Sequence, residues 1–278
     1  MKIIVPVLAF STLFISSSFA KEYILDKKGF INPVGTVYET AEALASEDFI
    51  LKIAGPQNQE MMINGVMKMN NSRKTTILSE KSYEVTLLSH EENNKMTMNG
   101  QALPNPPATP QPLLKIPIIY SFENDTWSAK AKEGEFTELQ QEEVDEKVSS
   151  LNKPHSPYSY EAKKIGDTWE TDISKSTGFF ASASSNNTTG SVKMKFLGIE
   201  DYAGHQCAKL EATFSITGKG DKGIVDISMK GSAIIHRSLT HFIDLSVKAK
   251  ALEMGMESPQ PKMSGKGAFE ASETVTFK

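Results

Sequence analysis

The sequence has one cysteine, Cys207, and only five histidines among its 278 residues. A single thiol can form neither an intramolecular disulfide nor a cysteine-cluster metal site. A formal charge of −4 supplies no strongly basic surface, so neither nucleic acid nor an anionic membrane is an expected partner. The sequence also lacks the nucleophile elbow, the zinc-protease motif, the phosphate loop and the dinucleotide fingerprint. We therefore predict no catalytic residues, no metal and no cofactor.

Long apolar runs are also missing. The apolar segment from Ile3 to Ile15 is shorter than the roughly 20 residues that a membrane span needs. It follows Lys2 and precedes Ser18-Phe19-Ala20, which together are typical of a secretory signal peptide with its cleavage site. We predict a signal peptide over 1–20, no integral membrane span, and export to the periplasm or the cell exterior. An uncleaved N-terminal anchor is the alternative.

What the sequence does contain is period-two alternation. Between Ala208 and Ile216, apolar and polar residues alternate without interruption, as expected for a strand that is buried on one face. Four further segments repeat this pattern, and their short connections favour antiparallel neighbours. The predicted fold class is mainly β, with a five-strand antiparallel meander. Its strands are expected at 192–196, 208–216, 225–229, 243–251 and 269–277.

One helix is predicted over 137–151. Thr137 and Gln140 have the spacing of a capping box, and Val144 and Val148 fall on one helical face. The helix is a candidate cover for the apolar face of the meander, because such a face must be buried against another element.

The proline-rich stretch 103–118 divides the chain into an N-terminal β unit, 21–102, and a C-terminal β unit with the helix, 119–278. The units are expected to be two curved half-barrels, or else one continuous sheet in which the proline-rich stretch is a long loop. Within the first unit, Asn64-Gly65 lies between two apolar stretches, which is a hairpin signal.

A short motif occurs in both units. "VGTVYET" at 34–40 and "IGDTWET" at 165–171 share Gly, Glu and Thr and match in kind elsewhere. The repeat favours a strand after each motif, whereas "TAEALASED" at 40–48 favours a helix by propensity. In the second copy, alternation predicts that Trp169 points inward and that Thr168, Glu170 and Asp172 point outward. A hydrolase would need Asp167, Glu170 or Asp172 to meet a histidine in a cleft.

Methionines are the most suggestive residues. Three Met-x-Met pairs, at 67 and 69, 96 and 98, and 254 and 256, would each project onto one face of a strand. Three interpretations stay open: filling of irregular core space, lining of a cavity for an apolar ligand, or Cu(I) binding by thioethers. The candidate ligand-lining residues are Met67, Met69, Met96, Met98, Met194 and Met229. Cys207 is a candidate reactive surface thiol on the strand that it shares with His205.

The layout resembles a class of exported bacterial β-rich proteins of unknown function. The resemblance rests on "IGDTWE" followed by "GSVKMKFLGIEDYAGHQCAKLEATFSITG", and it covers about 160–278. A looser, fold-level similarity is to the LolA-like periplasmic lipoprotein carriers, in which a bent sheet and a helix enclose a cavity for acyl chains. Neither resemblance implies site residues. We expect an exported, non-enzymatic binding protein for an apolar or lipid-like ligand, or alternatively an envelope-associated protein that contacts other proteins.

Overall fold

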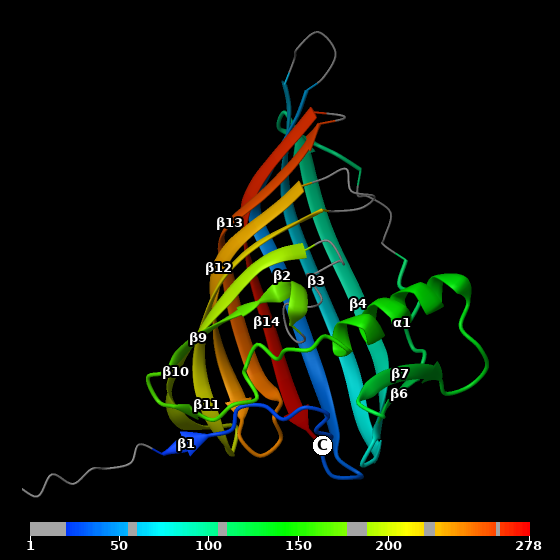
Figure 1. Cartoon of the computed structure of the whole chain (residues 1–278). Helices are drawn as coiled ribbons and strands as arrows, with labels where there is room; N and C mark the ends of the chain where they lie inside the picture. The colour runs from blue at the N-terminus through cyan, green and yellow to red at the C-terminus, as the bar shows by residue number, and fades with distance from the viewer. Residues whose placement is uncertain (1–20, 55–59, 105–109, 177–187, 220–225, 260–261) are drawn as a thin grey trace, which may run out of the picture.

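The structure is a computed structural model that describes residues 21–54, 60–104, 110–176, 188–219, 226–259 and 262–278 (Figure 1). The predicted signal peptide lies outside these residues. No helix among them is long and apolar enough to cross a membrane.

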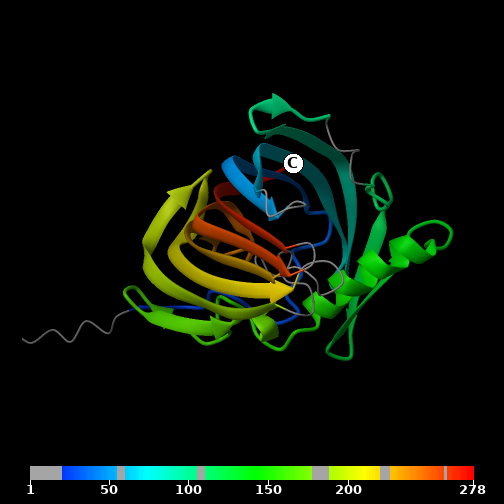
Figure 2. The ribbon, with the colours of Figure 1, turned by 90° about the horizontal axis from the view of Figure 1, so that it is seen from above.

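One antiparallel sheet of twelve strands dominates the molecule, which confirms the mainly β class. Its order is β7-β6-β4-β3-β2-β14-β13-β12-β11-β10-β9, with β5 beside β4. The strands are β2 (Val37–Ala54), β3 (Glu60–Ser79), β4 (Ser82–Met98), β5 (Gln101–Ala102), β6 (Ile118–Glu123), β7 (Thr126–Ala131), β9 (Thr168–Asp172), β10 (Thr188–Tyr202), β11 (His205–Lys219), β12 (Asp226–Ser238), β13 (Asp244–Pro259) and β14 (Lys262–Phe277). β1 (Glu22–Tyr23) and β8 (Lys163–Lys164) form a separate pair. Figure 2 shows that the large sheet curves round instead of lying flat.

The five-strand meander is confirmed as β10 to β14, and each strand is longer than predicted. Its last strand, β14, pairs with β2, while β6 pairs with β4, so strands on both sides of the proline-rich stretch belong to one sheet. The segment 40–48 lies in β2, as the repeat indicated and against its helical propensity. The hairpin prediction at Asn64-Gly65 was wrong. Both residues lie within β3, because each pairs with β2 on one side and β4 on the other.

The two copies of the short motif form the same turn. Gly35 and Gly166 both have a positive φ, 85° and 98°, which favours glycine. The Gly35 amide donates to the Ile77 carbonyl at 3.1 Å, and the Gly166 amide donates to the Phe196 carbonyl at 2.8 Å. In return, the Ile77 amide donates to the Thr36 carbonyl at 2.9 Å, and the Phe196 amide donates to the Asp167 carbonyl at 3.0 Å.

The register after each turn is also the same. Tyr38 pairs with Thr75, two residues before Ile77, and Trp169 pairs with Met194, two residues before Phe196. Exposure alternates from 168 to 172 with Trp169 on the protected side, as predicted. Trp169 packs against the main core, and its indole N–H donates to the Pro157 carbonyl at 2.8 Å.

The main core covers the face of the meander that carries Phe196, Leu210 and Ile235, here called the inner face of the sheet. Side chains on the inner face of one strand stand opposite inner-face side chains of its neighbours. The core is closed by segments from outside the meander, through Leu25, Tyr158 and Ile173, which are 0%, 4% and 2% exposed.

The helix α1 (Glu138–Leu151) confirms the predicted range and the capping box. Gln140 and Thr137 exchange both expected hydrogen bonds, at 2.9 and 3.4 Å. Its buried residue, Val144, packs with Ile118 and Tyr120 of β6, so α1 covers the β6–β7 end of the sheet and not the meander (Figure 1). The Asn152 side chain fixes the end of α1 to Trp127 of β7, with two hydrogen bonds of 2.7 and 3.0 Å.

A buried arginine joins three separate parts of the chain. The side chain of Arg237, on β12, is 7% exposed. It donates to the Leu25 carbonyl at 2.6 Å, to Asp26 at 2.7 Å and to Asp244 at 2.8 Å. The Tyr158 ring lies 3.9 Å from the guanidinium carbon, and the Tyr158 hydroxyl donates to Asp244. The N-terminal segment and the loop after α1 are thereby attached to the meander.

Replacing Arg237 with Gln should lower the free energy of unfolding by about 3–5 kcal/mol, because two poorly hydrated carboxylates lose their cation. Urea denaturation followed by tryptophan fluorescence measures the change. Lys230→Gln is the control, since its ion pair with Glu253 is exposed and such pairs contribute little. An Arg237 variant as stable as this control would contradict the assigned role.

Candidate functional site

The inner face of the sheet has two different environments. Over β10 to β12 it is dry, because Phe196, Leu210 and Ile235 are at most 1% exposed. Over β2 to β4 many apolar residues, such as Leu44 and Met69, are only half-buried, although Phe49 and Ile77 are buried. The curved sheet therefore has one filled half and one half in which apolar side chains still contact solvent, and the second is the candidate site.

Methionines gather on this half-buried part. Strand register places them on the inner face of neighbouring strands, together with branched aliphatic residues. Met98 stands opposite Ile63, Ile63 opposite Leu51, and Met256 opposite Ile227 and Gly265. We call this set the methionine band. Its half-buried members are Leu44, Leu51, Ile53, Met61, Ile63, Met67, Met69, Met96, Met98, Met254, Met256 and Met263.

The predicted lining residues divide between the two environments. Met67 and Met69 lie on β3, and Met96 and Met98 lie on β4, all of them half-buried in the methionine band. Met229, on β12, stands opposite Met254 of the band and packs against the main core. Met194 is 1% exposed between Trp169 and Ala212, so it fills core space.

Charged side chains occupy the inner face beside the methionine band. Arg73 of β3 forms ion pairs with Glu42 of β2 and with Glu273 of β14, the latter at 3.3 Å. The three side chains are 32%, 28% and 19% exposed, so solvent reaches them. Asn71 donates to Glu42 at 3.4 Å and contacts His90 of β4 at 2.7 Å. These side chains thus form one continuous network of ion pairs and hydrogen bonds across β14, β2, β3 and β4. We call Glu42, Arg73 and Glu273 the charged triad.

The helix supplies a fourth charge. Lys147 follows Val144 by one helical turn, and its side chain reaches solvent although the surrounding protein partly shields it. Desolvation by the surrounding protein is the main cause that lowers the pKa of Lys147, and repulsion from Arg73 is the next. Among the described residues, Lys147 forms no ion pair or hydrogen bond. Its ammonium group therefore interacts electrostatically with all three members of the charged triad without forming an ion pair with any of them.

Burial also affects Glu273, one of the two acids of the triad. Desolvation raises the pKa of Glu273 from 4.5 to about 7, although the neighbouring Arg73 favours the ionised carboxylate. Asp244 and Glu42 raise it further through repulsion. Near neutral pH, Glu273 is therefore a carboxyl group that gains or loses a proton easily.

The other singled-out residues lie elsewhere. Cys207 is 0% exposed, packs with Leu245 and Val275, and has its pKa raised to about 11 by burial, so the prediction of a reactive surface thiol was wrong. Asp167 accepts a hydrogen bond from the Lys164 amide in the glycine turn, at 2.8 Å. Asp172 accepts from the Ser174 amide at 2.9 Å, where it caps the short 3-10 helix η2 (Ile173–Lys175).

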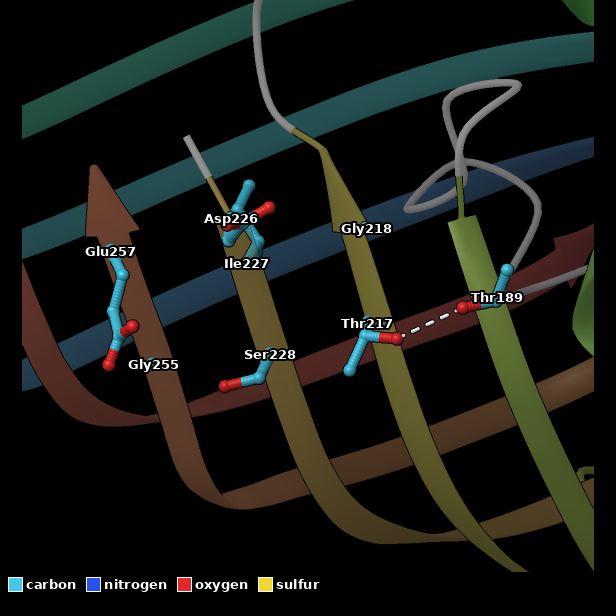
Figure 3. A pocket seen from close by; sticks show the side chains of 8 residues that line it. All are labelled: Thr189, Thr217, Gly218, Asp226, Ile227, Ser228, Gly255 and Glu257. Atoms are coloured by element: carbon cyan, nitrogen blue, oxygen red, sulfur yellow. Dashed lines mark hydrogen bonds between the residues drawn. The ribbon is translucent and has the colours of Figure 1, made fainter. Parts of the chain in front are cut away.

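A shallow hollow lies on the outer face of the sheet, which is the face opposite the core (Figure 3). It is a groove of about 510 Å³ across β10 to β13. Thr189 and Thr217 are hydrogen-bonded there at 3.0 Å, and Asp226 stands opposite Glu257. Its lining residues include the hydroxyl groups of Thr189, Thr217 and Ser228 and the carboxylates of Asp226 and Glu257. Within the described residues, no three His, Cys, Asp or Glu side chains could together hold a metal ion.

Comparison with known proteins identifies no family for the chain. No protein-family model and no curated protein matches the chain. Among solved structures, a lipovitellin structure on lipid–protein interactions aligns with 88% of this chain, which spans 25% of that chain, at 9% identity and a TM-score of 0.43. A Bacteroides fragilis protein with a YmcC-like fold aligns over 93% of this chain and 100% of its own, at 8% identity and a TM-score of 0.23.

An outer membrane channel from Pseudomonas putida aligns over 91% of this chain and 99% of its own, at 6% identity and a TM-score of 0.25. At such TM-scores, these likenesses carry no argument about function. The similarity to LolA-like carriers stays a prediction.

The charged triad was missed in the sequence, although a signal for it exists. In β14, the inner-face series Phe269, Ala271, Val275 and Phe277 is interrupted by Glu273. A charged residue at an inward position breaks the alternation, and such breaks mark functional or strained sites. Lys147 had no comparable signal, because a lysine on a helix with many charges is usually solvated.

Glu273→Gln should change how stability depends on pH. Between pH 4.5 and about 7, the folded protein holds a proton on Glu273 that the unfolded chain has lost, so this group makes stability fall as pH rises through that range. Gln cannot ionise, and the variant should therefore gain stability relative to the parent protein from pH 5 to pH 8.

Urea denaturation at pH 5, 6, 7 and 8 measures this difference. Glu270→Gln, on the outer face of the same strand, is the control and should show no such trend, because Glu270 is exposed beside Lys250. If the stability of the Glu273 variant and of the parent protein changed with pH in the same way, burial would not raise the pKa of Glu273.

Proposed function

We propose that this protein is an exported, non-enzymatic binding protein that holds an apolar or lipid-like ligand on the inner face of its sheet. The methionine band is the observation that carries the proposal. A dozen apolar side chains on five neighbouring strands, β2, β3, β4, β13 and β14, stay half-buried, while the core residues on the inner face of β10 to β12 are buried.

The chemistry of the band supports a ligand of adaptable shape. Methionine is unbranched, flexible and polarizable, so it fits irregular apolar partners. Burying this surface beneath a ligand would gain about 25 cal/mol for each Å² of apolar area removed from water. A thioether set of this kind would also suit Cu(I), but in the structure the band is continued by Leu44, Leu51, Ile53 and Ile63, which offer no ligand atoms.

Export is part of the proposal. It is supported by Lys2, the apolar segment and the Ser18-Phe19-Ala20 cleavage site. A periplasmic or extracellular location would give the protein access to envelope lipids or to apolar molecules from outside. Contact with an envelope protein remains the alternative function. The larger exposed apolar side chains, such as Val34, Leu139 and Ile165, come from separate segments.

The first test is extraction of the protein purified from its own host. Native mass spectrometry should show a bound mass that organic solvent removes, and the extract should contain an apolar or lipid-like compound. The purified, delipidated protein should then enhance the fluorescence of N-phenyl-1-naphthylamine, a neutral apolar probe. A folded protein with no extractable ligand and no probe binding would overturn the proposal.

Substitutions on β3 provide matched variants, because Met61 and Met62 are adjacent and point to opposite faces. Met61→Gln and Met69→Gln, on the inner face, should each weaken probe binding about fivefold, since a polar amide replaces about 1 kcal/mol of apolar contact. Met62→Gln should leave binding unchanged, because Met62 lies on the outer face and is 41% exposed. Equal effects of the inner and outer variants would place the probe elsewhere.

A further inference from the structure

Two cations from different elements approach the same part of the inner face. Arg73 projects from β3, and Lys147 projects from α1, which packs over β6 and β7. Repulsion from Arg73 is the strongest single charge interaction of Lys147, and the attractions to Glu42 and to Glu273, each taken alone, are weaker. Like charges brought together in a partly desolvated place cost free energy, because the medium screens them less than bulk water does. An anion placed between them would remove that cost.

Arg73 can also release a partner. Its guanidinium is shared by two carboxylates, Glu42 and Glu273, and one guanidinium fork matches one carboxylate or phosphate best. Glu273 takes up a proton readily near neutral pH, which weakens its hold on Arg73. An incoming anion could therefore replace Glu273 on Arg73, with Glu273 becoming the neutral carboxylic acid.

The inner face changes from charged to apolar along the strands that carry the triad. On β2 the next inner-face residue after Glu42 is Leu44, and on β3 the positions beyond Arg73 are Asn71 and then Met69. From Met69 the methionine band continues along β3 to Met61. Eight residues of strand span roughly 27 Å at about 3.4 Å per residue. A charged end followed by a long apolar strip is the shape of a single-chain amphiphile.

We propose that the ligand is an acidic amphiphile, a carboxylate or phosphate on an apolar chain, whose head lies between Arg73 and Lys147 and whose chain lies along the methionine band. This inference rests on the proposed function, because it names the class of ligand for the same site. Glu42 keeps its ion pair with Arg73 in the complex. Binding takes up a proton on Glu273, so affinity for the anion increases as the pH falls toward 6.

Four probes with the same chain test the head group: dodecanoate, dodecyl phosphate, dodecyltrimethylammonium and dodecanol. The three ions are used below their micelle concentrations, and dodecanol is used below its solubility limit. They are titrated into delipidated protein by displacement of N-phenyl-1-naphthylamine. The two anions should bind about tenfold more tightly than dodecanol, as expected for charge-assisted hydrogen bonds, and the ammonium should gain nothing. Acetate and inorganic phosphate, which have no chain, should not displace the probe.

The outcomes separate the two proposals. Binding of dodecanol without preference for the anions, or tighter binding of the ammonium, would overturn this inference and leave the proposed function standing. Competition by inorganic phosphate at the affinity of dodecyl phosphate would show a site for free anions, which also overturns the amphiphile. Failure of all four probes would overturn the proposed function as well.

A substitution on α1 tests whether Lys147 contacts the head group of the ligand. Lys147→Gln should weaken dodecanoate about tenfold and leave dodecanol unchanged, because only the charge is removed from an exposed helical position. Lys130→Gln is the control, because it makes the same change of net charge at an exposed position of β7. Lys130 lies on the face of β7 opposite the face against which α1 packs. A loss that is equal for dodecanoate and dodecanol, or no loss for either, would overturn the role of Lys147.

Discussion

The buried Arg237 guanidinium is the interaction on which the rest of the structure depends. A single sheet has no second layer, so its apolar face must be covered by its own curvature and by segments from elsewhere in the chain. Arg237 holds two such segments through Leu25, Asp26 and Tyr158. These are the segments that close the core over β10 to β12. The filled half of the molecule therefore depends on one ion network at the edge of its core.

That arrangement lets the two halves differ. The filled half supplies stability through side chains that are fully removed from water, such as Phe196 and Leu210. The half-buried side does not have to supply this stability. It carries the methionine band and the charged triad, and neither set of side chains is the best choice for a stable core. Residues that violate the rules of core packing are expected at functional sites, where the stability is supplied elsewhere.

Local patterns predicted the regular parts of the fold and missed the parts that depend on long-range contacts. The alternation of apolar and polar residues was sufficient to predict the strands β10 to β14, and the capping box of Thr137 and Gln140 was sufficient to predict where α1 begins. The Asn64-Gly65 hairpin failed because pairing on both sides holds an intrinsically turn-forming dipeptide in an extended strand. The charged triad joins the consecutive strands β2 and β3 to β14, and Glu273 is 200 residues from Arg73 in the sequence, so no local pattern could bring the three together. Only the interruption at Glu273 was visible.

The internal repeat shows that the charge of Arg73 is not a requirement of the shared turn. Counted from the shared glycine turn, Thr40 and Arg73 are opposite each other in the first copy, as Thr171 and Val192 are in the second. By the same count Glu42 corresponds to Ile173. Val192 and Ile173 are each 2% exposed in the main core. One copy of the unit thus holds an apolar pair where it is filled, and the other holds Arg73 and Glu42 where it is half-open. The shared turn and register extend as far as Thr40 and Thr171, after which Glu42 continues β2 and Ile173 begins η2. Because the shared part forms with either Arg73 or Val192, the charge at 73 is not required for this turn and register.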